Sequence, residues 1–83
     1  MEDYLILARS VTYAQRMQKA LSRAGIRSQI FRAPRDLSEL GCAYVVRIGP
    51  QDLRAALPVL NRERLGPFRV YGRQGGMFRE MGV

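Results

Sequence analysis

The chain has very little of the side-chain chemistry on which small enzymes usually depend. Its 83 residues include no histidine and a single cysteine, Cys42. Without histidine, Cys-His catalysis, a Ser-His-Asp triad and almost every kind of zinc site are excluded. One cysteine cannot form a disulfide within the chain, so we expect a reducing compartment, the cytoplasm. Any chemistry at Cys42 must therefore use one sulfur atom, assisted by arginine charges and backbone N–H groups.

Long hydrophobic runs and acidic residues are also scarce. No run is long enough to cross a bilayer and no leading apolar stretch is of the signal-peptide type, so we expect no membrane partner. Fourteen basic residues against seven acidic ones give a net charge of +7, which favours anionic partners such as RNA, acidic proteins or oxyanions. Since the cations are scattered through every segment, solubility explains this charge better than a dedicated binding stripe. The acids Asp3, Asp52 and Glu63 lack ligand spacing, so we predict no metal and no cofactor.

The periodicity of apolar residues predicts short strands alternating with two helices. Ser10 is a suitable N-cap for a helix that ends at Gly25. Pro50 is expected at the first position of the second helix, and Pro58 is expected to kink or shorten that helix. Strands are predicted over residues 4–8, 26–33, 43–48 and 68–71.

The two ends of the chain differ in composition. Residues 1–71 contain all of the predicted strands and helices, and a chain of this size supports one small domain. Residues 72–83 are rich in glycine and show no periodicity. We therefore expect a single domain over 1–71 followed by a flexible tail over 72–83.

The order strand, helix, strand, strand, helix, strand predicts a ferredoxin-like α+β sandwich. It has a four-stranded antiparallel sheet with both helices on one face. A right-handed crossover makes the first two strands parallel, with the third strand antiparallel between them. The start of the third strand, at Cys42, then lies at the same end as the start of the first helix. The backbone N–H groups of Ser10, Val11 and Thr12 should therefore point toward Cys42, near the loop over 34–41.

This neighbourhood is expected to favour the reactive form of Cys42. The thiolate is the nucleophile, and both a helix N-terminus and nearby guanidinium groups such as Arg35 favour the charged form. Gly41 lets the chain turn sharply and expose the sulfur, and Ser38 can donate a hydrogen bond to it. A persulfide needs only one sulfur on the protein. The alternative stays open that Cys42 is an ordinary buried residue at the start of an apolar strand.

The segment Ala33-Pro34-Arg35-Asp36-Leu37-Ser38, followed by Gly41-Cys42 and an apolar strand, resembles the family of putative selenium/sulfur (Se/S) carrier-like domains. The similarity extends over residues 3–71. It implies that the motif residues are Pro34, Arg35, Ser38 and Cys42. It also implies a protein that accepts sulfur or selenium on its cysteine and hands it to a partner protein, and that is not an enzyme in the turnover sense.

Two other functions fit the same order of strands and helices. The first is RNA binding, because Gly41 to Val45 is faintly similar to the third-strand motif of RNA-recognition domains. Cys42 and Arg47 occupy the places of two of that motif's three aromatic residues and only Tyr44 remains, so we expect weak, non-specific nucleic-acid binding at most. The second is a module for regulatory ligand binding or oligomerisation, with a homodimer formed through the sheet face.

Overall fold

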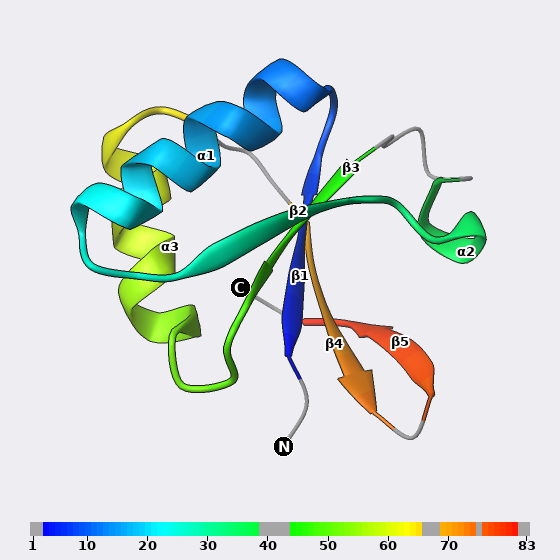
Figure 1. The fold of residues 1–83 in the computed structure, drawn as a ribbon. Coiled ribbons are helices and arrows are strands. Elements are labelled where there is room, and N and C mark those ends of the chain that lie inside the picture. Colours follow the sequence, from blue (N-terminus) through cyan, green and yellow to red (C-terminus); the bar gives the residue numbers. More distant parts are fainter. Residues whose placement is uncertain (1–2, 39–43, 66–68, 75, 82–83) are drawn as a thin grey trace.

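A computed structural model describes residues 3–38, 44–65, 69–74 and 76–81, which form one α+β unit (Figure 1). Strands and helices alternate along most of the chain. Of the helices in these described residues, none has the length and apolarity needed to cross a bilayer. The elements are β1 (Tyr4–Ala8), α1 (Val11–Arg23), β2 (Ser28–Arg32), α2 (Arg35–Ser38), β3 (Tyr44–Ile48), α3 (Leu53–Arg62), β4 (Val70–Gln74) and β5 (Met77–Glu80).

The strands form a five-stranded sheet in the order β2-β3-β1-β4-β5, in which every neighbouring pair is antiparallel. The predicted place of the third strand is confirmed, since β3 lies between β1 and β2. At one end of the sheet, Tyr44 lies opposite both Ala8 of β1 and Arg32 of β2. The end of β1, the end of β2 and the start of β3 therefore meet at the same edge.

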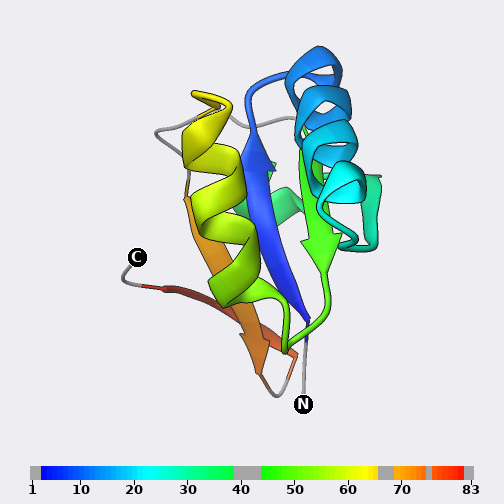
Figure 2. The same cartoon turned by 90° about the vertical axis from the view of Figure 1, so that its left-hand side faces the viewer.

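Helices α1 and α3 cover one face of this sheet (Figure 2). They do so because each helix has an apolar stripe, with charged and polar residues on its other side. The larger hydrophobic core lies between the helices and the strands. Its fully buried side chains include Met17, Leu21, Ile6, Val46, Ile48, Leu60 and Val70.

The opposite face of the sheet has a second, smaller core. Successive residues of a strand point to opposite faces, so Leu5 and Leu7 of β1 lie on this side together with Val45 and Tyr71. Leu37 of α2 packs against them and is only 2% exposed. The loop predicted over 34–41 thus includes a helical turn, α2, that covers part of this face.

The prediction of a four-stranded sheet is wrong, because Met77–Glu80 form a fifth strand. Both β5 and the second half of β4 fall within residues 72–83, which were expected to be a loose tail. Gly76 adopts φ +80°, a left-handed conformation that suits glycine in the tight turn before β5. Phe78 then packs against the second core, which gives the added strand a buried contact.

Two predictions about the second helix are also corrected. Pro50 lies in a turn rather than at the first helical position, and the N–H of Asp52 donates to the carbonyl of Gly49 within that turn. Of the two effects predicted for Pro58, shortening does not occur, since α3 continues past it to Arg62, and the kink stays a prediction. Pro58 is exposed, so the core is formed by other residues of α3.

Candidate functional site

The end of the sheet where β3 begins is the place predicted for the thiol chemistry. Helix α1 begins three residues after Ala8, and α2 begins three residues after Arg32. The pairing of both strands with Tyr44 brings the start of α1 and the start of β3 to this same edge. Cys42 and Gly41 themselves lie outside the described residues, as does the side chain of Ser38.

Ser10 caps helix α1. Its backbone is extended (φ −154°, ψ 166°), and its hydroxyl oxygen accepts a hydrogen bond from the N–H of Tyr13 at 3.2 Å. Its carbonyl oxygen accepts one from the N–H of Ala14 at 3.0 Å. The predicted N-cap is thereby confirmed, and the hydroxyl of Ser10 is already engaged with its own helix.

The next two backbone N–H groups, of Val11 and Thr12, lie in the first turn of α1, where a helix offers no acceptor of its own. Within the described part of the chain, neither of them has a hydrogen-bond acceptor. Unpaired donors at a helix N-terminus carry a partial positive charge and favour an anion. The N–H of Ser10 likewise has no acceptor among the described residues, so all three donors predicted from the sequence remain available at this edge.

Arg9 adds a cation that sequence reasoning did not select. It directly follows β1, and its guanidinium carbon lies 4.4 Å from the centre of the Tyr13 ring. The guanidinium carbon of Arg16 lies 5.6 Å from the same ring. The spacing of three residues from Tyr13 to Arg16 within the helix is a sequence signal that could have predicted the second contact, whereas Arg9 lies before the helix begins.

Pro34 and Arg35 form the start of α2 at the same edge. Pro34 is half-buried, and its carbonyl oxygen accepts a hydrogen bond from the N–H of Leu37 at 2.9 Å. Because Leu37 is buried in the second core, it anchors this short helix to the sheet. Arg35 is exposed at its first position. The helical turn therefore holds one positive charge near the sheet edge where β2 ends.

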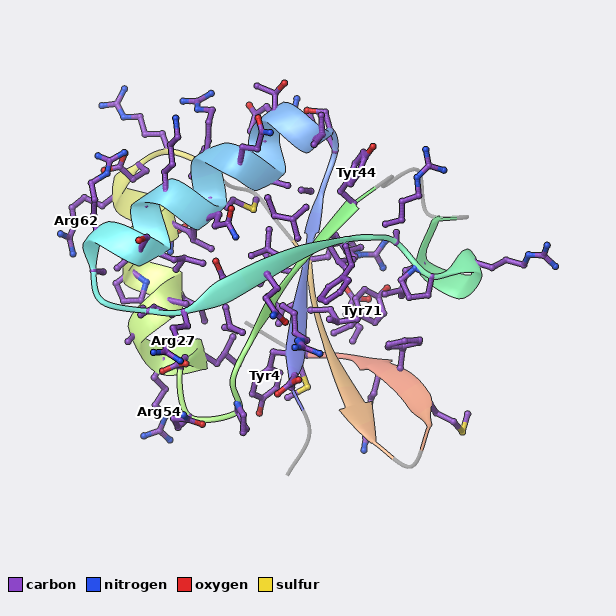
Figure 3. All side chains as sticks on the ribbon, viewed as in Figure 1. Tyr4, Arg27, Tyr44, Arg54, Arg62 and Tyr71 are labelled. Carbon is purple, nitrogen blue, oxygen red and sulfur yellow. The ribbon has the colours of Figure 1, made fainter. Side chains whose placement is uncertain are left out.

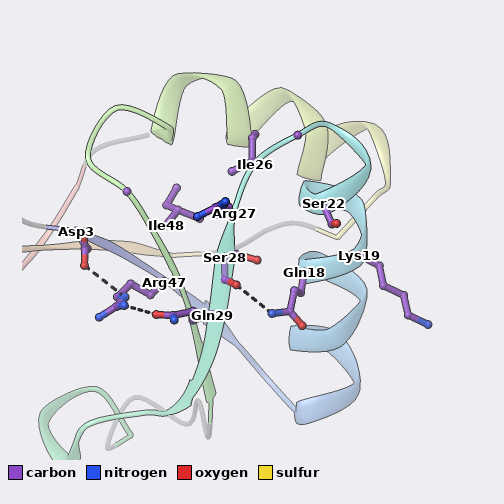
Figure 4. A pocket seen from close by; sticks show the side chains of 12 residues that line it. Asp3, Gln18, Lys19, Ser22, Ile26, Arg27, Ser28, Gln29, Arg47 and Ile48 are labelled. Carbon is purple, nitrogen blue, oxygen red and sulfur yellow. Dashed lines mark hydrogen bonds and ion pairs between the residues drawn. The ribbon is translucent and has the colours of Figure 1, made fainter.

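A separate groove of about 740 Å³ lies at the other end of the sheet (Figure 4). The Nε2 of Gln18 donates to the carbonyl oxygen of Ser28 at 3.1 Å, and Arg47 pairs with Asp3 at 3.4 Å and donates to Gln29. The buried hydroxyl of Ser28 has no hydrogen-bond partner among the described residues. The groove brings together residues from α1, β2 and β3 that no sequence motif connects. Its lining residues include the cations Lys19, Arg27 and Arg47.

The aromatic residue needed for RNA stacking does not face the open side of the sheet. Tyr44 packs against the core that lies under α1 and α3. On the opposite face Phe31 is 45% exposed, with the guanidinium carbon of Arg47 5.1 Å from its ring centre. The segment similar to the third-strand motif of RNA-recognition domains therefore lacks the remaining stacking residue as well as the two that the sequence already showed to be missing. Among the described residues, no group of three or more metal-ligating side chains comes together.

Comparison with known protein families gives a match over most of the chain. A family model described as putative Se/S carrier protein-like matches residues 3–72. This range contains β1 to β3, both long helices and the start of β4, and it includes Cys42. Neither the curated proteins nor the solved structures gave a match.

Proposed function

We propose that this chain, which belongs to the putative Se/S carrier protein-like family, holds one sulfur or selenium atom on Cys42 and delivers it to a partner protein. The observation that carries this proposal is the family match over residues 3–72, which includes the only cysteine of the chain. The same match includes Pro34, Arg35 and Ser38, the other residues of the motif. The strand order β4-β1-β3-β2 also supports a ferredoxin-like arrangement for this part of the chain.

The edge where β3 begins offers a suitable environment for an anionic sulfur. One residue separates Cys42 from Tyr44, and two residues of extended chain span about 7 Å at most. Tyr44 lies opposite Ala8, whose strand leads into the N-terminus of α1. The N–H groups of Val11 and Thr12 and the partial positive charge of the helix favour a thiolate or a persulfide anion there. The hydroxyl of Ser10 plays no direct part, because it caps the helix.

The transfer needs no external oxidant when the donor is a polysulfide or a persulfide. The thiolate of Cys42 attacks the terminal sulfur of the donor and forms a new S–S bond. The donor's own S–S bond breaks, and the rest of the donor leaves with the electron pair, as a thiolate from a persulfide or as a shorter polysulfide anion from a polysulfide. Delivery is the same exchange in the other direction, with the partner's thiolate attacking the terminal sulfur and Cys42 leaving. A selenium atom transferred from a selenium-containing donor follows the same balance.

Intact-mass measurement of the loading rate tests this proposal. The whole protein is incubated with inorganic polysulfide at neutral pH, beside a synthetic peptide of residues 39–45. We expect the protein to gain the mass of one sulfur atom faster than the peptide, by a modest factor because a more stable thiolate is also a weaker nucleophile. Cys42→Ser should abolish the gain. Equal rates for protein and peptide would contradict the proposal.

Charge variants then test the environment of the thiol. Arg9→Gln and Arg35→Gln should move the pH profile of the loading rate toward higher pH, because each removes a cation from the edge where β3 begins. Arg54→Gln is the matched control, since it removes the same charge from an exposed position of α3. If the pH profile shifts equally in all three variants, only the net charge of the protein affects the loading rate. That result would contradict a specific effect of Arg9 and Arg35 on Cys42.

A further inference from the structure

The charges of this chain are unevenly distributed along the sequence. Residues 4–35 contain no aspartate or glutamate at all. The same segment contains seven of the fourteen basic residues, which are Arg9, Arg16, Lys19, Arg23, Arg27, Arg32 and Arg35. All seven acidic residues lie before or after this segment. No acidic residue therefore lies within β1, α1 or β2 themselves.

Helix α1 gathers three of these cations on one surface. Arg16, Lys19 and Arg23 are all exposed, and at 100° per residue they lie within an arc of about 60° around the helix axis. Arg27 follows just after the helix ends and is exposed as well. We call Arg16, Lys19 and Arg23 the basic face. It lies on the side of α1 away from the buried residues of that helix, where nitrogen-tipped side chains project outward (Figure 3).

Repulsion between the cations of the basic face lowers the stability of helix α1. Cations three or four residues apart repel one another on a helix surface, and Arg16, Lys19 and Arg23 have this spacing. Among the described residues, the ion pairs recorded join Arg47 to Asp3 and Arg69 to Glu80, and none involves the basic face. A face that serves solubility alone normally mixes charges of both signs. The uniform charge here is better explained by a negatively charged partner.

We propose that the basic face is a docking surface for an acidic protein segment. A helix with carboxylates at spacings of three and four residues matches the spacing of Arg16, Lys19 and Arg23. The face continues into the groove, where Lys19 and Arg27 are among the lining residues. This inference rests on the arrangement of charge and does not depend on chemistry at Cys42.

A protein partner fits this face better than a nucleic acid. Base stacking needs an available aromatic ring, and the aromatic ring on α1, that of Tyr13, is covered by the guanidinium groups of Arg9 and Arg16. Phosphate contacts alone would give weak binding without sequence preference. Carboxylates pair with a guanidinium in the same bidentate geometry as phosphates do, and a helix can hold them at the three- and four-residue spacing of the basic face.

Two triple variants with the same change in charge test the proposal. Arg16→Gln/Lys19→Gln/Arg23→Gln removes the basic face, and Arg54→Gln/Arg64→Gln/Arg79→Gln removes three exposed cations from α3, from just beyond it and from β5. The probe is a glutamate-rich helical peptide, and binding is measured by fluorescence anisotropy at physiological salt. We expect the first variant to bind about tenfold more weakly than the second, with both folded by circular dichroism.

Other results would overturn the proposal in distinguishable ways. Equal losses in the two variants would show that only net charge attracts the peptide. A single-stranded oligonucleotide of equal charge that binds the wild type more tightly than the peptide, and loses that affinity only in the first variant, would identify a nucleic acid as the partner. Nuclear magnetic resonance shifts on adding the peptide should map to α1, and shifts confined to α3 would also contradict the assignment.

Discussion

Arg69 donates two hydrogen bonds to the carboxylate of Glu80, from Nε to Oε2 at 2.8 Å and from Nη2 to Oε1 at 2.7 Å. This bidentate pair links the residue before β4 to the last residue of β5. It also lies beside the second core, because the guanidinium carbon of Arg69 is 5.7 Å from the ring centre of Tyr71. The fifth strand is thus held at its end by a charged contact as well as by backbone pairing.

The Arg69 pair should make the attachment of β5 sensitive to acid. The hydrogen bond from Arg69 is the main cause that holds the pKa of Glu80 below its ordinary value, and the positive charge of Arg69 acts in the same direction. A carboxyl group whose pKa falls on folding stabilises the folded state above its unfolded pKa, and this contribution is lost as the pH falls through the folded pKa. The protection of the β5 amides against hydrogen exchange should therefore fall as the pH drops below the usual range for glutamate, once the intrinsic slowing of exchange in acid is corrected for.

The Glu80→Gln variant isolates this effect. Its β5 amides should exchange faster than those of the wild type at neutral pH and should lose the additional acid dependence. Glu63→Gln is a suitable control, because Glu63 is exposed and outside the recorded ion pairs. The global unfolding midpoint should change little, since both side chains of the pair are nearly half exposed and such pairs contribute weakly. An unchanged pH dependence in Glu80→Gln would refute this role.

Removing the cap of α1 should weaken the whole fold. Ser10→Ala loses the hydroxyl that accepts from the N–H of Tyr13, and we expect a loss of about 1 kcal/mol in the free energy of unfolding. Urea denaturation measures it. Ser10→Asp should restore most of the loss, because aspartate also caps well and places a negative charge at the helix N-terminus. Thr12→Ala is the control and should cost much less, and an equal cost would show that Ser10 does not act as a cap.

Truncating Leu37 should cost far more stability than its place in a four-residue helix suggests. Its side chain is 2% exposed and packs on Leu5, Leu7, Val45 and Tyr71. Leu37→Ala should lower the free energy of unfolding by about 2–4 kcal/mol through lost burial and a cavity. Leu57→Ala, at a half-buried position of α3, should cost less. A small effect of Leu37→Ala would mean that the second core contributes little to the stability of the sheet.

Sequence reasoning predicted the elements that depend on local patterns. The strand β1 was predicted with its observed bounds, and α1 followed from the N-cap at Ser10 and the stop at Gly25. The elements that were missed depend on distant contacts. Helix α2 is anchored by the buried Leu37 and has four residues, too few to show a helical period. Strand β5 is defined by its register with β4 rather than by an alternating pattern of its own.

For the candidate site, the sequence predicted the end of the sheet where it lies, but not the contacts of its side chains. Strand order and handedness correctly placed the start of β3 beside the start of α1, because these follow from general rules of chain connection. Side-chain roles did not follow from the same rules. The hydroxyl of Ser10 is used within its own helix, and the contact of Arg9 with Tyr13 depends on rotamers that a sequence does not specify.

The ends of α1 and α3 allow a matched test of backbone conformation. Both helices end with the same hydrogen bond, from the N–H of Ile26 to the carbonyl of Leu21 at 2.9 Å and from the N–H of Leu65 to the carbonyl of Leu60 at 3.1 Å. The residue before each of these donors has positive φ: Gly25 in the first case (φ +79°) and Arg64 in the second (φ +57°). Glycine adopts this conformation freely, whereas an arginine is strained in it.

Opposite substitutions at these two positions should therefore change stability in opposite directions. Gly25→Ala should lower the free energy of unfolding by about 1 kcal/mol. A Cβ atom at Gly25 would meet no atom within 4 Å, so the loss would arise from the backbone and not from a clash. Arg64→Gly should raise it by about 0.5 kcal/mol, because the relief of strain exceeds the added freedom of glycine in the unfolded chain. Urea denaturation of both variants measures the difference, and a stabilising Gly25→Ala or a destabilising Arg64→Gly would contradict the shared helix-end geometry.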